Sequence, residues 1–225
     1  MEAFGPQLIK VLEIIWVNII LSGDNAVVIA MACRSLPVAQ RRTGMVLGAG
    51  VAVVLRIIFT VLVATLLSTP FLKIIGSLLL LWVAVKLITG EDEGSEIAAS
   101  ERLMHAVRTI AIADAVMSLD NVLAIAAVAQ DSTALLVLGL AISIPLIVAG
   151  ATLIMVLLER FPILVWAGAA LLGWIAGEML ISDPALVTRL GGEMVHRLEF
   201  PIAAIGAALV LALGYVMNRY SASAS

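Results

Sequence analysis

The stretch Ser22-Gly23-Asp24-Asn25 is followed by five apolar residues, and it recurs as Ser118-Leu119-Asp120-Asn121, again followed by five apolar residues. Both stretches lie inside long apolar runs that are typical of membrane-spanning helices. An ionisable side chain in the middle of such a helix costs about 2.5–3.5 kcal/mol on insertion scales, so it requires a structural or functional reason. The doubled Asp-Asn motif is therefore the feature from which we argue fold and function.

The overall composition indicates that most of the chain is solvated by lipid. Of 225 residues, 63% are hydrophobic and 13% charged, and the mean hydropathy is +1.16. Soluble domains are about 45–50% apolar and about 25% charged. This excludes a soluble enzyme, a secreted disulfide scaffold, a disordered regulator and a basic nucleic-acid binder. The net charge of −3 gives no indication of nucleic acid as a partner, and the single cysteine, Cys33, allows no internal disulfide.

The apolar runs predict an all-α polytopic membrane protein with seven transmembrane helices in a single transmembrane domain, 1–225. We expect residues 7–32 to form a retained helix rather than a cleaved signal, because the first charge is Glu2 instead of a basic residue. Pro70, Pro162 and Pro201 are expected at helix starts, where a missing N–H costs little, and Pro145 is expected to kink the fifth helix. The predicted helices are 7–32, 45–68, 71–89, 107–128, 134–158, 162–181 and 200–218, with an acidic linker at 90–106 and a loop at 182–199.

Lysine and arginine placement predicts the orientation in the membrane. Cytoplasmic segments carry an excess of these residues. If the spans alternate in direction, the segments after spans one, three, five and seven lie on one side of the membrane, and they carry more lysine and arginine than the other side. This predicts that the N-terminus is outside and the C-terminus is cytoplasmic. The residues on that side are Arg34, Arg41, Arg42, Arg102, Arg108, Arg160 and Arg219, against Lys10, Lys73, Arg189 and Arg197 on the other.

An internal repeat accompanies the doubled motif. Helices one to three, 7–89, match helices four to six, 107–181, and the seventh helix is additional. Three spans per copy is an odd number, so the second copy enters the membrane from the opposite face. That is the inverted 3+3 helix repeat of secondary transporters, whose substrate site lies near the midplane between the repeats. The matches outside the motif are Pro70 with Pro162, Gly76 with Gly168 and Trp82 with Trp174.

The polar residues of helices one and four predict a cation site. In an inverted repeat the two Asp-Asn pairs can meet at the midplane. Asn18 precedes Asn25 by two helical turns and shares its face, and Asp114 has the same relation to Asn121. Carboxylates, amides and the Ser22 and Ser118 hydroxyls are hard oxygen donors, which suit Mg²⁺, Ca²⁺ and Mn²⁺. Zinc or copper is poorly supported, because His105 and His196 are expected in or near loops.

The charge of this region also favours a divalent cation. Glu13, Asp24, Asp114 and Asp120 together would bring four negative charges, and Arg56 brings one positive charge. A divalent cation would leave the group nearly neutral, which offsets much of the desolvation cost. For Arg56, structural pairing with an aspartate and a role in gating both stay open. Lys86 and Glu178 lie late in their spans, where snorkelling to the membrane surface explains them.

In these motifs the chain resembles the TerC family of integral membrane proteins, and most of all its shorter YjbE-type branch. The resemblance rests on Leu21-Ser22-Gly23-Asp24-Asn25-Ala26, on Ser118-Leu119-Asp120-Asn121-Val122 and on Gly76 to Lys86, and it covers essentially the whole chain. It implies a multi-pass protein of the bacterial cytoplasmic membrane, in a family associated with manganese export. Carried over by motif or position, the metal-site candidates are Asp24, Asn25, Asp120, Asn121, Asn18 and Asp114.

We therefore expect a transporter that exports divalent metal ions, foremost Mn²⁺ as transported substrate, with no prosthetic group and no enzymatic activity. The expected partners are the metal ion and the lipid bilayer, while contact with secretion machinery and a homo-oligomer stay open. Two other functions stay open as well. One is a membrane assembly or interaction protein whose polar residues only hold helices together. The other is an exporter of a small organic solute, in which Arg56 with an aspartate would bind a zwitterion.

Overall fold

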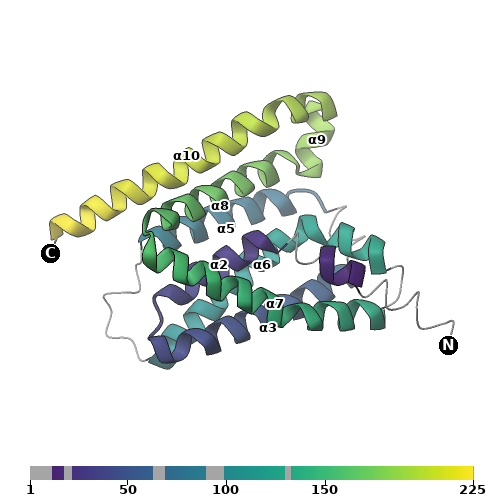
Figure 1. Ribbon diagram of the computed structural model, residues 1–225. Coiled ribbons are helices and arrows are strands. Elements are labelled where there is room, and N and C mark those ends of the chain that lie inside the picture. The colour runs from purple at the N-terminus through teal and green to yellow at the C-terminus, as the bar shows by residue number, and fades with distance from the viewer. Residues whose placement is uncertain (1–11, 18–21, 63–68, 90–98, 130–132, 225) are drawn as a thin grey trace, which may run out of the picture. The chain divides into compact units, whose positions relative to one another are not determined.

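The computed structural model describes residues 12–17, 22–62, 69–89, 99–129 and 133–224, with backbone alone at 99, 120–129, 133–136 and 220–224. All elements in these ranges are helices (Figure 1), which confirms the all-α fold class. A short helical segment at 12–17 precedes the longer ones. The longer helices are α2 (Gly23–Arg34), α3 (Val38–Val61), α5 (Leu72–Thr89), α6 (Ala99–Ala129), α7 (Thr133–Arg160), α8 (Ile163–Ile181), α9 (Pro184–Leu190) and α10 (Gly192–Ala224).

Five of the described helical stretches are long and apolar enough to cross a membrane, which agrees with a polytopic membrane protein. They correspond to the second, third, fifth, sixth and seventh predicted spans. The first and fourth predicted spans, 7–32 and 107–128, include residues outside the described part or described by backbone alone, so seven spans stay a prediction. The five stretches are Val38–Val61, Leu72–Thr89, Val137–Arg160, Ile163–Ile181 and Gly192–Arg219.

Three helices begin about two turns before their predicted starts. Helix α3 begins at Val38 rather than 45, α6 at Ala99 rather than 107, and α10 at Gly192 rather than 200. The predicted starts marked where the sequence becomes apolar, but backbone hydrogen bonds continue a helix through polar residues. His105 and His196 therefore lie in helices and not in loops, and Pro201 lies inside α10 rather than at its start. Pro145 lies inside α7, as predicted.

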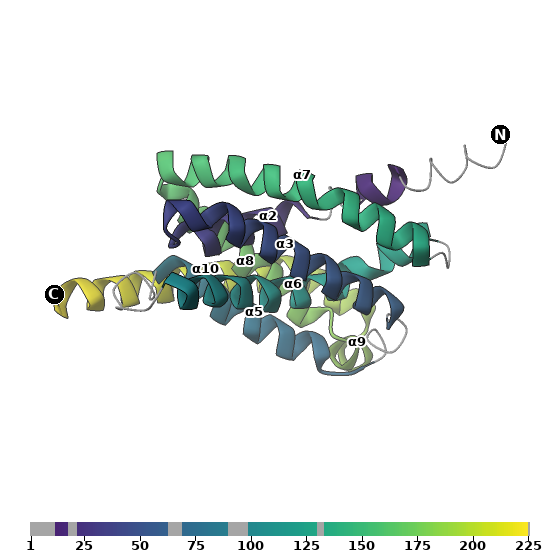
Figure 2. The ribbon, with the colours of Figure 1, turned by 90° about the horizontal axis from the view of Figure 1, so that it is seen from below.

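The chain divides into two compact units, and each predicted repeat contributes to both. The first unit comprises residues 1–67 and 103–155, and thus holds α2, α3 and most of α6 and α7. Ile14 packs with Val53 of α3 and Leu140 of α7 in a buried cluster. Close packing of α3 on α6 is set by Gly48, where a Cβ would lie 2.5 Å from Ile110 Cδ1. These helices are seen together in Figure 2.

The second unit comprises residues 68–102 and 156–225, and thus holds α5, α8, α9 and α10. In Figure 1, α10 runs beside α8 and begins at the end where α9 lies. Glycines allow the two backbones to touch. A Cβ at Gly173 would lie 2.6 Å from the Gly206 carbonyl oxygen, and one at Gly177 would lie 2.5 Å from the Ile202 carbonyl oxygen. Small residues at such crossings are the usual means of helix association in membranes.

One fully buried carboxylate, Asp183, joins the start of α5 to the turn between α8 and α9. Its Oδ1 accepts hydrogen bonds from the backbone N–H of Phe71 (3.0 Å) and of Ala185 (2.8 Å). Its Oδ2 accepts from the N–H of Lys73 (3.1 Å) and Ile74 (3.3 Å). Asp183 therefore caps two helix N-termini at once, where backbone N–H groups otherwise lack partners. It also fixes Phe71, whose φ of 65° is rare for a residue with a side chain.

Candidate functional site

A buried arginine organises the polar centre of the first unit. Arg56, near the C-terminal end of α3, is only 2% exposed and is the largest fully buried side chain described. Its Nη2 donates to Asp114 Oδ1 of α6 at 3.0 Å, as part of an ion pair. Its Nη1 donates to Ser22 Oγ at 2.8 Å, just before α2, and its Nε donates to Ser118 Oγ of α6 at 3.4 Å. Arg56 thus links three segments.

Ser22 and Ser118 complete the hydrogen bonds of the Arg56–Asp114 pair. Ser118 Oγ donates to the second carboxylate oxygen, Asp114 Oδ2, at 3.1 Å. Both oxygens of Asp114 therefore have hydrogen-bond donors, and all three guanidinium nitrogens of Arg56 have acceptors. A buried ion pair withstands its desolvation cost only when such additional hydrogen bonds are made. Of the two roles left open for Arg56, pairing with an aspartate is the one that the structure supports.

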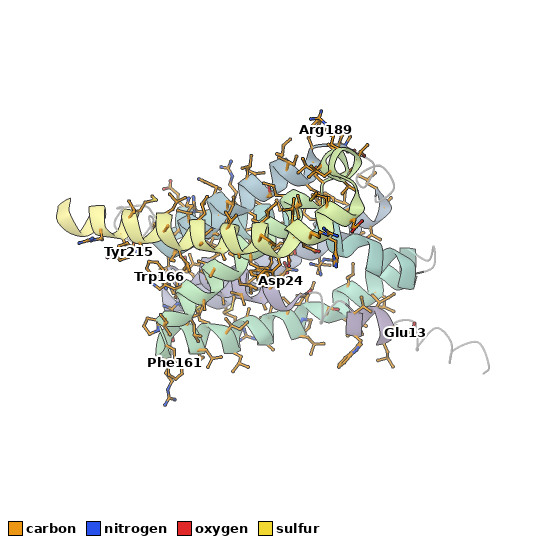
Figure 3. All side chains as sticks on the ribbon, turned by 90° about the horizontal axis from the view of Figure 1, so that it is seen from above. Glu13, Asp24, Phe161, Trp166, Arg189 and Tyr215 are labelled. Carbon is orange, nitrogen blue, oxygen red and sulfur yellow. The ribbon has the colours of Figure 1, made fainter. Side chains whose placement is uncertain are left out.

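Beside this pair, the Asp24-Asn25 motif begins helix α2. Asp24 lies in the first turn of α2 and is half-buried, and its Oδ1 accepts from the backbone N–H of Asn25 at 2.8 Å. Electrostatic interaction couples Asp24 to both Arg56 and Asp114. Asp24 is labelled in Figure 3.

Asn25 is the unexplained group of this region. It is 4% exposed, and within the described part of the chain neither its Oδ1 nor its Nδ2 has a hydrogen-bond partner. A buried polar group without a partner costs about 1–3 kcal/mol, so it requires an explanation such as a bound ligand. An amide oxygen beside a carboxylate is a suitable donor pair for a hard cation.

The other predicted ligands are only partly placed. Asn18 lies outside the described residues. Asp120 and Asn121 lie in the continuous helix α6, close to Asp114 and Ser118 along the chain, but only their backbone is described. Asp114 itself is paired with Arg56, and the Ser22 and Ser118 hydroxyls accept hydrogen bonds from the same arginine.

Glu13 does not belong to this cluster. It was counted among its charges, but it is exposed and lies apart from Asp24 in Figure 3. Nowhere in the described ranges, this cluster included, is there a group of three His, Cys, Asp or Glu side chains that could hold a metal ion. A cation site in the first unit therefore needs amide oxygens or the second Asp-Asn pair in addition to Asp24.

In the second unit, the two late charges contact tryptophans of their own helices. Lys86 Nζ lies 5.4 Å from the centre of the Trp82 ring, and Trp174 Nε1 donates to Glu178 Oε1 at 2.6 Å. These i,i+4 contacts occupy matching positions of α5 and α8, and they give both charges a structural role.

Sequence reasoning singled out Arg56 but missed Asp183, which it placed in the loop 182–199. The available signal was the dipeptide Asp183-Pro184, because Asp is favoured at the N-cap and Pro at the first helical position. That signal would have predicted α9, although not the contact with α5.

Comparison with known proteins agrees with the motif. The model of the family described as "Integral membrane protein TerC family" matches residues 4–224. The chain is 38% identical over 208 residues to the membrane protein YjbE of Bacillus subtilis strain 168, covering 92% of this chain and 95% of the relative. It is 28% identical over 210 residues to the membrane protein YceF of the same organism, covering 89% and 79%. No solved structure matches the chain.

Proposed function

Because the chain belongs to the TerC family of integral membrane proteins, as its motifs predicted, we propose that it is a transporter that exports divalent metal ions. Mn²⁺ is the proposed substrate. Its proposed path runs through the Asp-Asn motifs of helices one and four, between two inverted three-helix repeats. The protein is a multi-pass membrane protein in contact with the lipid bilayer, so a path for ions has to pass between its helices.

The observation that carries the proposal is the Asn25 amide. It is almost fully buried, both of its polar side-chain atoms lack partners among the described residues, and it directly follows Asp24 in the chain. Hard oxygen donors of this kind bind Mn²⁺, Mg²⁺ and Ca²⁺ rather than zinc or copper. A cation held by the Asp24 carboxylate and the Asn25 amide oxygen would supply the missing interaction.

The division of the chain supports the repeat. The first unit ends at Leu67 in the first proposed copy and at Met155 in the second, so each copy gives two helices to the first unit and one to the second. An internal repeat is expected to divide its helices between the two units in this same order in both copies. Alternating access would then move helices of one repeat against those of the other around the midplane site.

The competing functions are less well supported. An organic-solute exporter would need Arg56 as a counter-charge for a substrate carboxylate, but its guanidinium nitrogens already bind Asp114, Ser22 and Ser118. An assembly protein would need polar residues that hydrogen-bond across helices, and the Asn25 side chain makes no such bond within the described residues. The Arg56–Asp114 pair by itself fits either role.

The test is Mn²⁺ transport by the purified protein in liposomes. Wild-type protein, Asp24→Asn and the exposed control Glu193→Gln are reconstituted, and uptake of radioactive manganese is followed. We expect saturable uptake by wild type and control, and a loss of at least about tenfold for Asp24→Asn, which keeps the shape of the side chain but removes its charge. Uptake by wild type no faster than by protein-free liposomes would refute the proposal.

A further inference from the structure

Arg56 presents an electrostatic problem that pairing alone does not explain. A transporter of divalent cations has no evident use for a permanent positive charge beside its site, since that charge repels the substrate. Guanidinium stays protonated at every physiological pH. Yet Arg56 is 2% exposed, donates from all three nitrogens and interacts electrostatically with Asp24 as well as with Asp114.

The hydrogen bonds determine which carboxylate remains for a cation. Arg56 and Ser118 occupy one oxygen each of Asp114, which is 3% exposed. Asp24 accepts only a backbone N–H of its own helix among the described contacts, and the amide beside it has no partner. Arg56 thus pairs with Asp114 of α6, whereas Asp24 of α2 has no side-chain donor among the described contacts. Counted as formal charges, the described side chains Arg56, Asp24 and Asp114 sum to one net negative charge, whereas the two aspartates alone would carry two.

We infer that Arg56 is a resident counter-ion that removes Asp114 from the cation ligands and keeps the negative charge of the site low enough for a bound divalent cation to leave again. This inference rests on the proposed cation site. Transport requires binding that is favourable enough for entry and weak enough for release. A site with both carboxylates free would hold a divalent cation more tightly and release it more slowly. Arg56 acts through charge and through Asp114, so it is a positioning residue and not a ligand.

The experiment compares Mn²⁺ affinity across a charge-matched set of variants in detergent, by titration with MnCl₂. Arg56→Gln frees Asp114 and removes one positive charge from the cluster, and we expect Mn²⁺ to bind on the order of tenfold tighter or more, with slower transport turnover in liposomes. Arg56→Gln combined with Asp114→Asn restores the wild-type net charge, and its affinity should return to within about threefold of wild type. Arg56→Lys keeps the charge and should also bind near wild type.

The outcomes separate this inference from the proposed function. Folded Arg56→Gln that binds Mn²⁺ equally or more weakly overturns the inference, because a purely structural arginine would not oppose binding. Loss of binding in the double variant also overturns it, since Asp114 would then be a ligand. If Arg56→Gln does not fold, the double variant is the remaining test, because it buries no unpaired charge. Affinity near that of wild type then supports the inference, and loss of binding overturns it.

Tight binding by Arg56→Gln without transport by wild type would support the inference and refute the proposed function. If wild type transports Mn²⁺ and Arg56→Gln binds it with unchanged affinity, the proposed function is supported and the inference is refuted. If no variant binds Mn²⁺, both fail.

Discussion

At the scale of single residues, two buried polar side chains of the first unit differ in how well they are satisfied. Arg56 has an acceptor for each nitrogen, whereas Asn25 has neither donor nor acceptor among the described atoms. In a protein interior a complete network contributes to stability, and an incomplete one costs stability unless a ligand completes it. In the proposed transporter the Arg56–Asp114 pair is therefore the satisfied counter-ion pair, and Asn25 is the group that a bound cation would satisfy.

Replacement of Asn25 by leucine distinguishes these roles. The two side chains are similar in size, and Asn25→Leu removes an unsatisfied amide, so we expect the free energy of unfolding to stay the same or rise by about 1–2 kcal/mol. We expect Mn²⁺ affinity to fall by at least about tenfold. Thermal unfolding in detergent and MnCl₂ titration measure the two effects. The matched control is Ser143→Ala, which removes a buried hydroxyl whose one hydrogen bond among the described residues is to the Gly139 carbonyl of the same helix.

The opposite result has an equally clear meaning. If Asn25→Leu unfolds easily and still binds Mn²⁺ normally, the amide holds helices together and is no ligand. Sequence alone could identify Arg56 and the aspartates as unusual, because their charge conflicts with an apolar run. It could not determine which aspartate Arg56 binds, since Asp24, Asp114 and Asp120 all lie at suitable depths and side-chain reach exceeds the differences between them.

At the scale of helices, apolar runs predict the middle of a helix better than they predict where it begins and ends. The prediction 71–89 for α5 agrees with Leu72–Thr89, because Pro70 and the acidic linker bound that run sharply. The prediction 200–218 misses two turns of α10, because residues such as Glu193 and Arg197 continue the helix and form an i,i+4 ion pair. The polar start of α10 has charged residues at helical spacing, but it is not apolar, and the prediction used apolar runs alone.

Asp183 is expected to be essential for the local stability of the second unit. Asp183→Ala leaves four backbone N–H groups without their acceptor, and we expect a loss of about 3 kcal/mol or more in unfolding free energy. Hydrogen exchange should accelerate at Phe71, Lys73 and Ile74. Asp183→Asn keeps one carbonyl oxygen and should lose less. Unchanged exchange at these amides in Asp183→Ala would show that water replaces the carboxylate without cost.

The contact between α8 and α10 is expected to tolerate no added carbon. A Cβ on Gly206 would collide with the carbonyl oxygen of Gly173, and both atoms belong to backbones that cannot turn aside. We expect Gly206→Ala to destabilise the protein by about 1–3 kcal/mol, as overpacking does. Gly50→Ala in α3 is the matched control, because its Cβ would meet nothing within 4 Å. It should be neutral or stabilise by about 0.5–1 kcal/mol. Equal melting temperatures would contradict this account.

At the scale of the whole molecule, composition predicts a membrane protein but not its topology. The order of the residues predicts an inverted repeat, because each copy has an odd number of spans. The doubled motif and the matched Pro, Gly and Trp positions predicted two copies. Membership of the family and the helical fold are confirmed, while the seven spans and the repeat stay predictions. The division into units, with helices of both copies in each, could not be predicted, because it depends on packing between segments that are distant in the chain.

The proposed orientation, with the N-terminus outside, predicts which loops face which side. In a Cys33→Ser background, Glu193→Cys is expected to react with a membrane-impermeant thiol reagent on intact cells, because residues 182–199 would lie outside. Arg160→Cys should react only after the membrane is opened. Both positions are exposed, so a difference in labelling reflects the side of the membrane rather than burial of the thiol. Labelling of Arg160→Cys alone on intact cells would reverse the orientation.

The capping of α5 by Asp183 also constrains the order of events during synthesis. The Phe71 amide and its acceptor are 112 residues apart, and ribosomes add roughly 5–20 residues per second. The nascent α5 therefore emerges from the ribosome about 6–22 s before its cap exists. Throughout that interval the N–H groups of Phe71, Lys73 and Ile74 lack their carboxylate acceptor. The contact that caps α5 is therefore made only after the whole of α8 has been synthesised.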